Sequence, residues 1–376
     1  MSPLRIAIVT DWFAPRRGGI EAHLLQLAQR LGERGHMVDV FTSTPDPTRG
    51  GAFRAEALHL ARLPGAGVVV SPRLLHVLRE RLAGGYDIVH AHVSVVSPVG
   101  YAAAVVARAM GLPTVVTFHS VLEGKRHLLA AANAVAGIGQ SGVVWSAVSA
   151  LVAAQASSAL ESPVTELSNG IELAEWRGGE RTRGAGVFTI VSATRLHRKK
   201  RARQLLLAFA RAGERAGVPA RLVIFGDGPE RPRLSADIGA LGLDRGAVRA
   251  ELAGWVGPSE LRAAFAAGDL FAMASRKESF GIAALEARAA GLPVVAMDGA
   301  GCAEFLRGDE DAVLCADDEA LTFAIAASMR RGGKPSRRAK EPDLGRYDWS
   351  AVLAGHERAY EMARTRSVAL AAAGAS

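Results

Sequence analysis

Two glutamates beside a short apolar run have the spacing of a ligand-binding pair. Glu278 follows the apolar run 270–274, and Glu286 lies eight positions later, in a helical pattern that stops at Gly291. A buried carboxylate in that position can accept two hydrogen bonds from the hydroxyls of a ribose. The start of the helix and Gly281 offer N–H donors to a phosphate or a sugar hydroxyl. Without further context, two glutamates near a helix start are more often capping and surface residues.

A cationic segment follows the first apolar run of the second half of the chain. Five Lys and Arg residues fall within positions 195–201, among them Arg195 and Lys200. Arg can bind two phosphate oxygens at once and Lys acts as a point charge, so this segment would suit a diphosphate. A solvated basic loop would have the same composition, and charge alone does not separate the two interpretations.

A third candidate is the loop 11–21, which follows the first apolar run of the chain. Gly18 and Gly19 precede a helical pattern, so backbone N–H groups and the helix dipole could approach an anion there. Paired glycines are weak evidence, because glycines at strand-to-helix turns are often purely conformational. The loop lacks the G-x-G-x-x-G spacing and no acidic residue ends the next strand, which argues against a nicotinamide dehydrogenase.

The elements that position these candidates are apolar runs alternating with helical patterns along both halves of the chain. This alternation predicts βαβ units and mainly parallel sheets. It predicts an α/β protein of two Rossmann-like, doubly wound domains facing a central cleft, with ligands at the carboxyl ends of the strands. The expected strands are 4–10, 37–42, 87–91, 113–118 and 143–148 in the first half, and 187–193, 221–225, 270–274, 293–297 and 312–315 in the second.

The length of 376 residues agrees with two domains of ordinary size. The segment 176–186 contains four Gly and three Arg, breaks the alternating pattern, and is the predicted boundary. We therefore expect one domain at 1–178, a second at 187–345, and a separate C-terminal segment at 346–376. The stretch 128–160 contains no charged residue but is interrupted by Gly, Asn and Gln, so we predict a helix, a buried strand and a helix rather than a membrane span.

Charge and cysteine content restrict the partners and the compartment. The net charge of +8 comes from Arg spread along the chain, and no fingerprint interleaves these residues with aromatics, so no nucleic-acid partner is expected. Cys302 and Cys315 fit neither a disulfide framework nor a zinc motif, which favours free thiols in a reducing cytoplasm. The run 4–10 is too short for a signal peptide.

No cluster of His, Cys and Asp has metal-ligand spacing, so neither a metal nor a cofactor is expected. The segment 309–311 is spelled Asp-Glu-Asp, as a metal-binding Asp-x-Asp would be. It lies in a glycine-flanked loop, and an exposed acidic turn is the prediction there.

Taken together and in order, these segments resemble the retaining glycosyltransferases of family 4, which have the GT-B fold and share an E-x7-E motif. The resemblance extends over almost the whole chain. Any one matching segment is weak evidence, but eight in the right order are strong. The matching segments are 18–21, 90–92, 117–120, 168–171, the R-L-x-x-x-K element with Arg195 and Lys200, the G-x-G-P turn at 226–229, 254–256, and Glu278 to Glu286.

The resemblance implies a role for each matching residue. Arg195 and Lys200 would hold the donor diphosphate and stabilise its charge as the bond to the sugar breaks. Glu286 would bind the ribose, Glu278 would orient the transferred sugar, and His119 would lie near the reacting centre. The other residues implied at the donor are Gly19, Gly226, Val256, Ser279, Phe280, Gly281 and Ile282. Thr194 and Arg201 stand where the family often has Gly, so the shape of the cationic loop is less closely implied.

The resemblance also implies the reaction and its partners. The family transfers a sugar from a nucleotide diphosphate with retention of configuration, and UDP- and GDP-sugars are both compatible with this sequence. The acceptor would be a glycan or a lipid-linked molecule, because the loop 11–21 with 117–120 is similar to members that glycosylate phosphatidylinositol. The amphipathic segment 72–81 and the surplus positive charge would suit peripheral contact with the inner face of a membrane. The C-terminal helix would cross back to the first domain.

Two alternatives of other classes are compatible with the same architecture. A sugar-nucleotide epimerase would share the fold but would not need Arg195 and Lys200 together with the E-x7-E motif. A non-catalytic nucleotide-sugar-binding protein would be indicated by loss of Glu278, Arg195 or Lys200, and all three are present.

Overall fold

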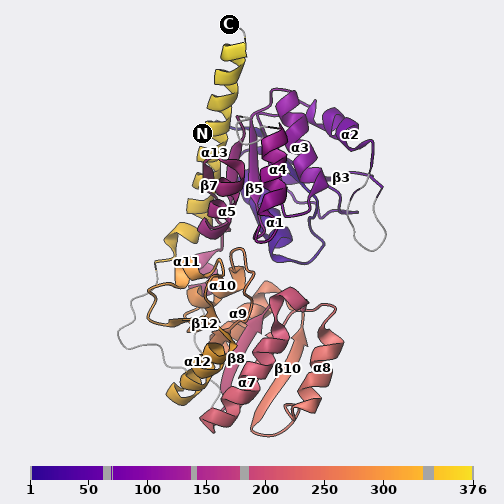
Figure 1. The fold of residues 1–376 in the computed structure, drawn as a ribbon. Helices are drawn as coiled ribbons and strands as arrows, with labels where there is room; N and C mark the ends of the chain where they lie inside the picture. The colour runs from indigo at the N-terminus through magenta and orange to yellow at the C-terminus, as the bar shows by residue number, and fades with distance from the viewer. Residues whose placement is uncertain are drawn as a thin grey trace. The chain divides into compact units, whose positions relative to one another are not determined.

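The chain divides into two units, each built around its own parallel sheet. The computed structural model describes residues 2–61, 69, 71–136, 142–177, 186–332 and 343–374. The first unit comprises Met1–Gly170 with Trp349–Ser376, and the second comprises Ile171–Asp348 (Figure 1). Most of the predicted boundary segment, residues 178–185, lies outside the described residues.

Among the described residues, the first unit contains a seven-stranded sheet in the order β3-β2-β1-β4-β5-β6-β7, and every neighbouring pair is parallel. The order reverses direction between β1 and β4, which is where doubly wound sheets bind ligands at the carboxyl ends of their strands. The strands are β1 (Arg5–Thr10), β2 (Met37–Thr42), β3 (Phe53–Ala57), β4 (Ile88–Val93), β5 (Thr114–Phe118), β6 (Val144–Ala147) and β7 (Val164–Glu166).

Helices cover both faces of this sheet (Figure 1). One hydrophobic core contains side chains of α2, α3 and α5, and a second contains side chains of α1 and α13. The C-terminal helix α13 thus belongs to the first unit, where its Leu353 and Tyr360 are buried. The helices are α1 (Gly19–Glu33), α2 (Leu74–Leu82), α3 (Pro98–Ala109), α4 (Arg126–Ala136), α5 (Ala150–Leu160) and α13 (Trp349–Gly374).

The second unit repeats the architecture, with six described strands in the order β10-β9-β8-β11-β12-β13, all parallel. Its sheet reverses direction between β8 and β11. The strands are β8 (Phe188–Ala193), β9 (Ala220–Phe225), β10 (Val248–Gly254), β11 (Leu270–Ala272), β12 (Val294–Met297) and β13 (Ala312–Cys315). The helices are α6 (Leu173–Arg177), η2 (Arg198–Lys200), α7 (Ala202–Ala216), α8 (Arg231–Ala240), α9 (Pro258–Ala267), α10 (Ile282–Ala289), α11 (Ala303–Leu306), α12 (Asp318–Arg331) and η3 (Gly345–Tyr347).

The two parallel sheets confirm the predicted α/β class with two Rossmann-like units. Strands β3, β7 and β10 were not among the expected strands, and each lies at the edge of its sheet. Their residues are only partly buried, so they lack the continuous apolar run of a central parallel strand.

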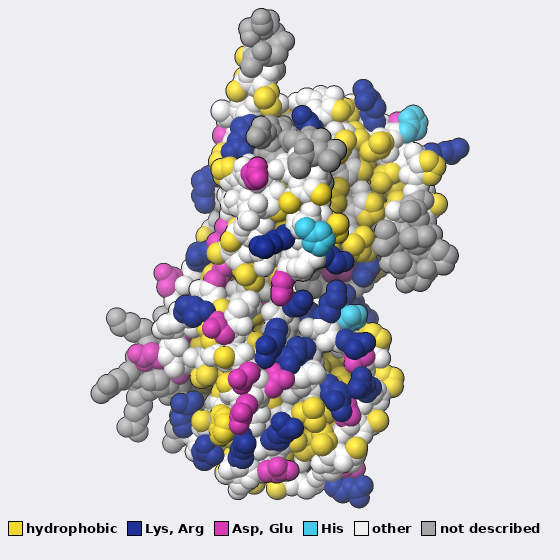
Figure 2. All heavy atoms as spheres, viewed as in Figure 1, with side chains coloured by type: hydrophobic (Ala, Val, Ile, Leu, Met, Phe, Trp, Pro, Cys, Tyr) yellow, Lys and Arg dark blue, Asp and Glu magenta, His cyan; other side chains and the backbone are white. Residues whose placement is uncertain are grey.

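The surface carries mixed charge. Figure 2 shows Lys and Arg side chains spread over both units, with acidic side chains among them, and hydrophobic side chains over α2 and α3 of the first unit. Within the part of the chain that the structure describes, no helix is both long and apolar enough to span a membrane.

Candidate functional site

Two predicted site residues of the second unit form an ion pair at the switch point of its sheet. Strands β8 and β11 are paired neighbours, so the loops that follow them lie side by side. Lys200 comes from the loop after β8, and its Nζ donates a hydrogen bond to Oε2 of Glu278, at 2.7 Å, in the loop after β11. The Lys200 side chain is 30% exposed and that of Glu278 is 15% exposed. A cation and a carboxylate are thus held together where a doubly wound sheet binds its ligand.

Arg201 fastens the loop that carries Lys200. Its backbone is left-handed, with φ of 56°, which explains why glycine would be favoured at this position. Its guanidinium donates to both carboxylate oxygens of Asp318, at 2.9 and 2.6 Å, and to the carbonyl oxygen of Ala274 at 3.2 Å. Arg201 therefore connects the end of the cationic loop to the end of β11.

The glycines of the turn after β9 allow a close approach to the same loop. Gly226 has φ of 119°, and a Cβ there would overlap the carbonyl oxygen of Thr194. Its N–H donates to the carbonyl of Gly254 at 2.7 Å, next to the loop that contains Val256. Arg195 is exposed in the loop after β8, beside this turn. The structure therefore brings Gly226, Val256 and Arg195 to the same edge of the sheet.

Gly226→Ala is expected to destabilise the second unit and to weaken nucleotide binding, because the turn must move away from Thr194. The backbone conformation alone costs an L residue about 1–3 kcal/mol. The matched control is Gly239→Ala in α8, where an added Cβ meets no atom within 4 Å. Thermal unfolding should show a lower Tm for the first variant and an unchanged or higher Tm for the second. Equal Tm values would contradict the predicted close approach.

A second loop clamps the segment between the two glutamates. The N–H of Gly301 donates to the carbonyl of Glu278 at 2.8 Å, and Gly281, with φ of 93°, packs against Cys302. Phe280 is turned into the core, where its ring lies 5.7 Å from that of Phe305. Its side chain therefore anchors the loop while the partly exposed Ser279 and Ile282 flank it. Gly281 is also the N-cap of α10, so this helix begins within the predicted donor-binding segment.

Glu286 lies on α10, the helix that begins directly after the clamped loop. Desolvation raises the pKa of its carboxyl group to about 8, and the charge of Arg262 opposes that shift. Arg262 itself donates to Glu175 at 2.6 Å. A carboxyl group with this pKa is poised between a hydrogen-bond donor and an acceptor near neutral pH, which is typical of ligand-binding positions.

The prediction of an exposed acidic turn at 309–311 is wrong for Asp309. The side chain was predicted to belong to an exposed acidic turn, but it is 8% exposed and forms two hydrogen bonds with Arg288, at 2.6 and 3.1 Å. Arg288 is buried on α10 and also donates to the carbonyl of Leu292. Asp309 therefore stabilises the helix that carries Glu286.

In the first unit, His119 belongs to a buried cluster of imidazoles. It follows β5, and its Nε2 lies 2.9 Å from Nδ1 of His92, so one of these nitrogens donates to the other. His90 forms two hydrogen bonds. Its Nε2 lies 2.7 Å from Oγ1 of Thr117, and its Nδ1 lies 3.0 Å from the hydroxyl oxygen of Tyr360. The His119 ring is 3% exposed.

The rest of the cluster comes from helices. His23 on α1 stacks on Trp349 at 5.2 Å between ring centroids, and His356 on α13 lies 5.6 Å from His90. The described residues contain no group of His, Cys, Asp and Glu arranged to hold a metal ion. His356 and Tyr360 could not be assigned to this cluster from the sequence, because no local pattern links α13 to the strand ends.

Acid is expected to destabilise the first unit through these rings. Burial lowers the pKa of His119 to about 3 and that of His356 to about 4, and it lowers the pKa values of His23, His90 and His92. The unfolded chain takes up protons at these rings below about pH 6.5 while the folded unit does not, so the free energy of unfolding falls as pH falls from there toward 4. The contribution of His356 alone is on the order of 3 kcal/mol.

The measurement is the Tm against pH for the natural chain and for His356→Gln. The variant should lose less stability between about pH 6.5 and 4, because it has one ring fewer to protonate on unfolding. Burial raises the pKa of Asp11 to about 6, which opposes the trend in both proteins and cancels in the comparison. Parallel curves for the two proteins would contradict the assignment.

Asp11 organises the first loop of the chain, although no sequence motif marks it as a site residue. Its carboxylate accepts hydrogen bonds from the N–H groups of Val99 and Gly100, both at 3.2 Å, at the start of α3. Asp11 therefore fixes the beginning of the loop that ends at Gly19, the first residue of α1. Beside Gly19, the buried Glu21 pairs with Arg16 at 3.1 Å.

Two family models match the two halves of the chain. Residues 17–175 match "Glycosyltransferase Family 4", and residues 187–330 match "Glycosyl transferases group 1". A component of the phosphatidylinositol N-acetylglucosaminyltransferase of Arabidopsis thaliana is 28% identical over 87% of this chain and 74% of its own length. Phosphatidyl-myo-inositol mannosyltransferase of Mycobacterium leprae is 26% identical over 96% of this chain and 98% of its own.

Solved structures agree on the fold. The crystal structure of Anabaena HepE in complex with UDP-glucose superimposes with a TM-score of 0.69 at 18% identity, covering 95% of this chain and 98% of that one. Both halves of the chain match glycosyltransferase models, and the two sheets have the topology of the GT-B fold. The chain therefore belongs to the family 4, group 1 glycosyltransferases with the GT-B fold and is a glycosyltransferase.

Proposed function

We propose that this glycosyltransferase moves a hexosyl group, with retention of configuration, from a UDP- or GDP-sugar to a glycan or lipid-linked acceptor. The observation that carries the proposal is the contact between Lys200 and Glu278 at the switch point of the second sheet. A cation suits a diphosphate and a carboxylate suits the hydroxyls of a sugar, so the pair fits the two halves of a nucleotide-sugar donor.

Each residue of the site has a separate role in the proposed reaction. Lys200 and Arg195 neutralise the diphosphate as the bond between its oxygen and the anomeric carbon breaks. Glu278 orients the sugar, and Glu286 binds the ribose. The acceptor oxygen forms the new bond on the face that the phosphate leaves, and the departing phosphate takes the acceptor proton. No metal or other cofactor takes part in this scheme, and His119 has the role near the reacting centre that the family resemblance implies.

The names of the relatives support an acceptor with a lipid or an inositol group. Two of them act on phosphatidylinositol by name, one as an N-acetylglucosaminyltransferase and one as a mannosyltransferase. Their sugars differ, and the Anabaena structure contains UDP-glucose. The proposal therefore includes both UDP-sugars and GDP-sugars as donors. We infer that the enzyme works in the cytoplasm, at the inner face of a membrane.

The test is a thermal-shift screen of the full chain against UDP, GDP, ADP and their sugar conjugates. A nucleotide present at 100 times its Kd adds about 2.7 kcal/mol to the free energy of unfolding. One nucleotide should stand out, and the anomeric configuration of the product formed from its sugar conjugate then tests retention. A response to a nucleotide-sugar without transfer to any acceptor would favour the non-catalytic binding protein. No response to any nucleotide would overturn the donor assignment.

A further inference from the structure

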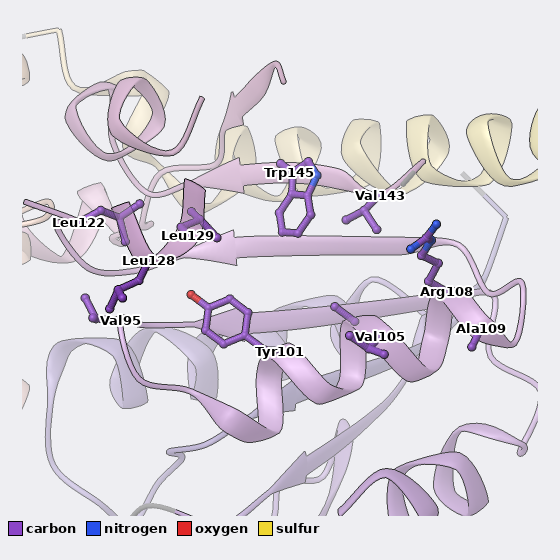
Figure 3. Close-up of a pocket in the computed structure, with 11 residues that line it drawn as sticks. Val95, Tyr101, Val105, Arg108, Ala109, Leu122, Leu128, Leu129, Val143 and Trp145 are labelled. Atoms are coloured by element: carbon purple, nitrogen blue, oxygen red, sulfur yellow. The ribbon is translucent and has the colours of Figure 1, made fainter. Parts of the chain in front are cut away.

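An apolar pocket of about 670 Å³ lies in the first unit between α3 and the start of α4 (Figure 3). Its volume falls within the range of small-molecule sites, roughly 300–1,000 Å³. The side chains from Tyr101 to Ala109 form one wall, and they extend about 12 Å along the helix axis. Trp145 and Val143 form the floor, and Leu128 lines the opposite wall.

The two ends of this pocket differ in chemistry. At the carboxyl edge of the sheet, Val95, Leu122 and Leu128 supply apolar surface, and the hydroxyl of Tyr101 there donates to the carbonyl of Ser94 at 3.1 Å. At the amino edge, Arg108 lines the pocket, and Val143 is held there by Arg366, whose guanidinium donates to its carbonyl at 3.1 Å. The pocket thus has an apolar end and a cationic end, as a site for an anionic amphiphile requires.

The charge of Arg108 and the exposed rim of the pocket point to an occupant. The ring of Trp145 lines the pocket, but its indole Nε1 is buried, with no hydrogen-bond partner among the described residues and almost no surface that an occupant could reach. Within the same described part of the chain, no carboxylate pairs with Arg108. Val105 and Leu128 line the pocket and are 57% and 59% exposed, so its rim is an apolar surface open to solvent.

We infer that this pocket binds one acyl chain of an anionic phospholipid, with the headgroup phosphate at Arg108 and the chain extending toward Leu122. The headgroup then lies at the amino edge of the sheet, whereas His119 follows β5 at the carboxyl edge. A lipid bound in this way anchors the first unit to a membrane and is distinct from the acceptor. The inference is therefore independent of the proposed donor and acceptor.

The experiment uses Trp145 as the reporter. The full chain is mixed with vesicles of phosphatidylglycerol brominated on the acyl chains, and with vesicles of brominated phosphatidylcholine of the same chain length. Bromine quenches indole fluorescence on close approach. Quenching should occur with the anionic vesicles, and most of it should be absent from Trp145→Phe.

Variants separate the contributions of charge and of the pocket. Arg108→Ala should weaken binding to the anionic vesicles about fivefold, the effect of one cation near an anionic surface. Ala104→Phe fills the pocket and Val105→Glu places a carboxylate at its rim, so both should remove the Trp145 quenching. The matched control is Val368→Glu, on a side chain of α13 that is 71% exposed, and it should quench as the natural chain does.

Three results would overturn the inference. The first is quenching that persists unchanged in Trp145→Phe, because the bromines would then lie near other tryptophans. The second is equal quenching by anionic and zwitterionic vesicles, because Arg108 would then have no part. The third is retention of the full quenching by both Ala104→Phe and Val105→Glu with native Tm values.

Discussion

Lys200→Ala is expected to slow sugar transfer by about 10²–10³-fold, the cost of removing one preorganised group that stabilises transition-state charge. The Lys200 Nζ lies 2.7 Å from Glu278, so the cation is held at the switch point before any donor binds. Its attraction to the diphosphate grows as negative charge develops on the leaving group. The loss should therefore appear mainly in kcat, with a smaller change in donor affinity.

The matched control for this experiment is Lys199→Ala, which removes the neighbouring charge. Lys199 is exposed on the same 3-10 helix. Its backbone N–H donates a hydrogen bond to Nδ1 of His197. Transfer should be close to that of the natural chain, because a solvated surface charge contributes little. An equal loss in both variants would mean that the overall charge of the loop matters and that Lys200 has no specific role.

Donor binding is expected to strengthen about tenfold between about pH 7 and 9, because Glu286 must ionise to accept both ribose hydroxyls. Its pKa is raised to about 8 by burial, so most of the carboxyl groups are protonated at neutral pH. The folded-state pKa lies above the unfolded value, so this residue also lowers the free energy of unfolding as pH rises from about 4.5 to 8. Calorimetric titration with the nucleotide found in the thermal-shift screen measures the first effect.

Two variants test whether Glu286 is the group that titrates. Glu286→Gln should bind the nucleotide more weakly at about pH 9 and lose the pH dependence, and Glu286→Ala should weaken binding at every pH. Glu214→Gln, an exposed position on α7, should retain the affinity and the pH profile of the natural chain. A pH dependence that survives in Glu286→Gln would assign it to another group and remove the basis for the ribose contact.

The strands buried at the centre of each sheet could be predicted from the sequence because they are continuous apolar runs. β1, β8 and β12 show this, since nearly all their residues are buried. The edge strands β3, β7 and β10 could not, because one side of each is free of a neighbouring strand and their residues need not be apolar. The class of the fold followed from the central strands together with β13, the edge strand that was predicted at 312–315.

The candidate site shows the same division between local and long-range information. The residue types of Lys200 and Glu278 and their places at strand ends were readable from the sequence, but the two are 78 positions apart. Their contact depends on the strand order, which makes β8 and β11 neighbours although β9 and β10 come between them in the chain.

The burial of polar side chains was decided by tertiary packing. The sequence placed Glu286 on a helix, but only the packing around α10 gives its carboxyl group a pKa of about 8. The sequence likewise contained His356 and Tyr360 without indicating that α13 brings them to His90. Local patterns encode which elements form, because backbone geometry responds to neighbouring residues. The partners of a buried polar group depend on segments far away in the chain, because desolvation is a property of the assembled core.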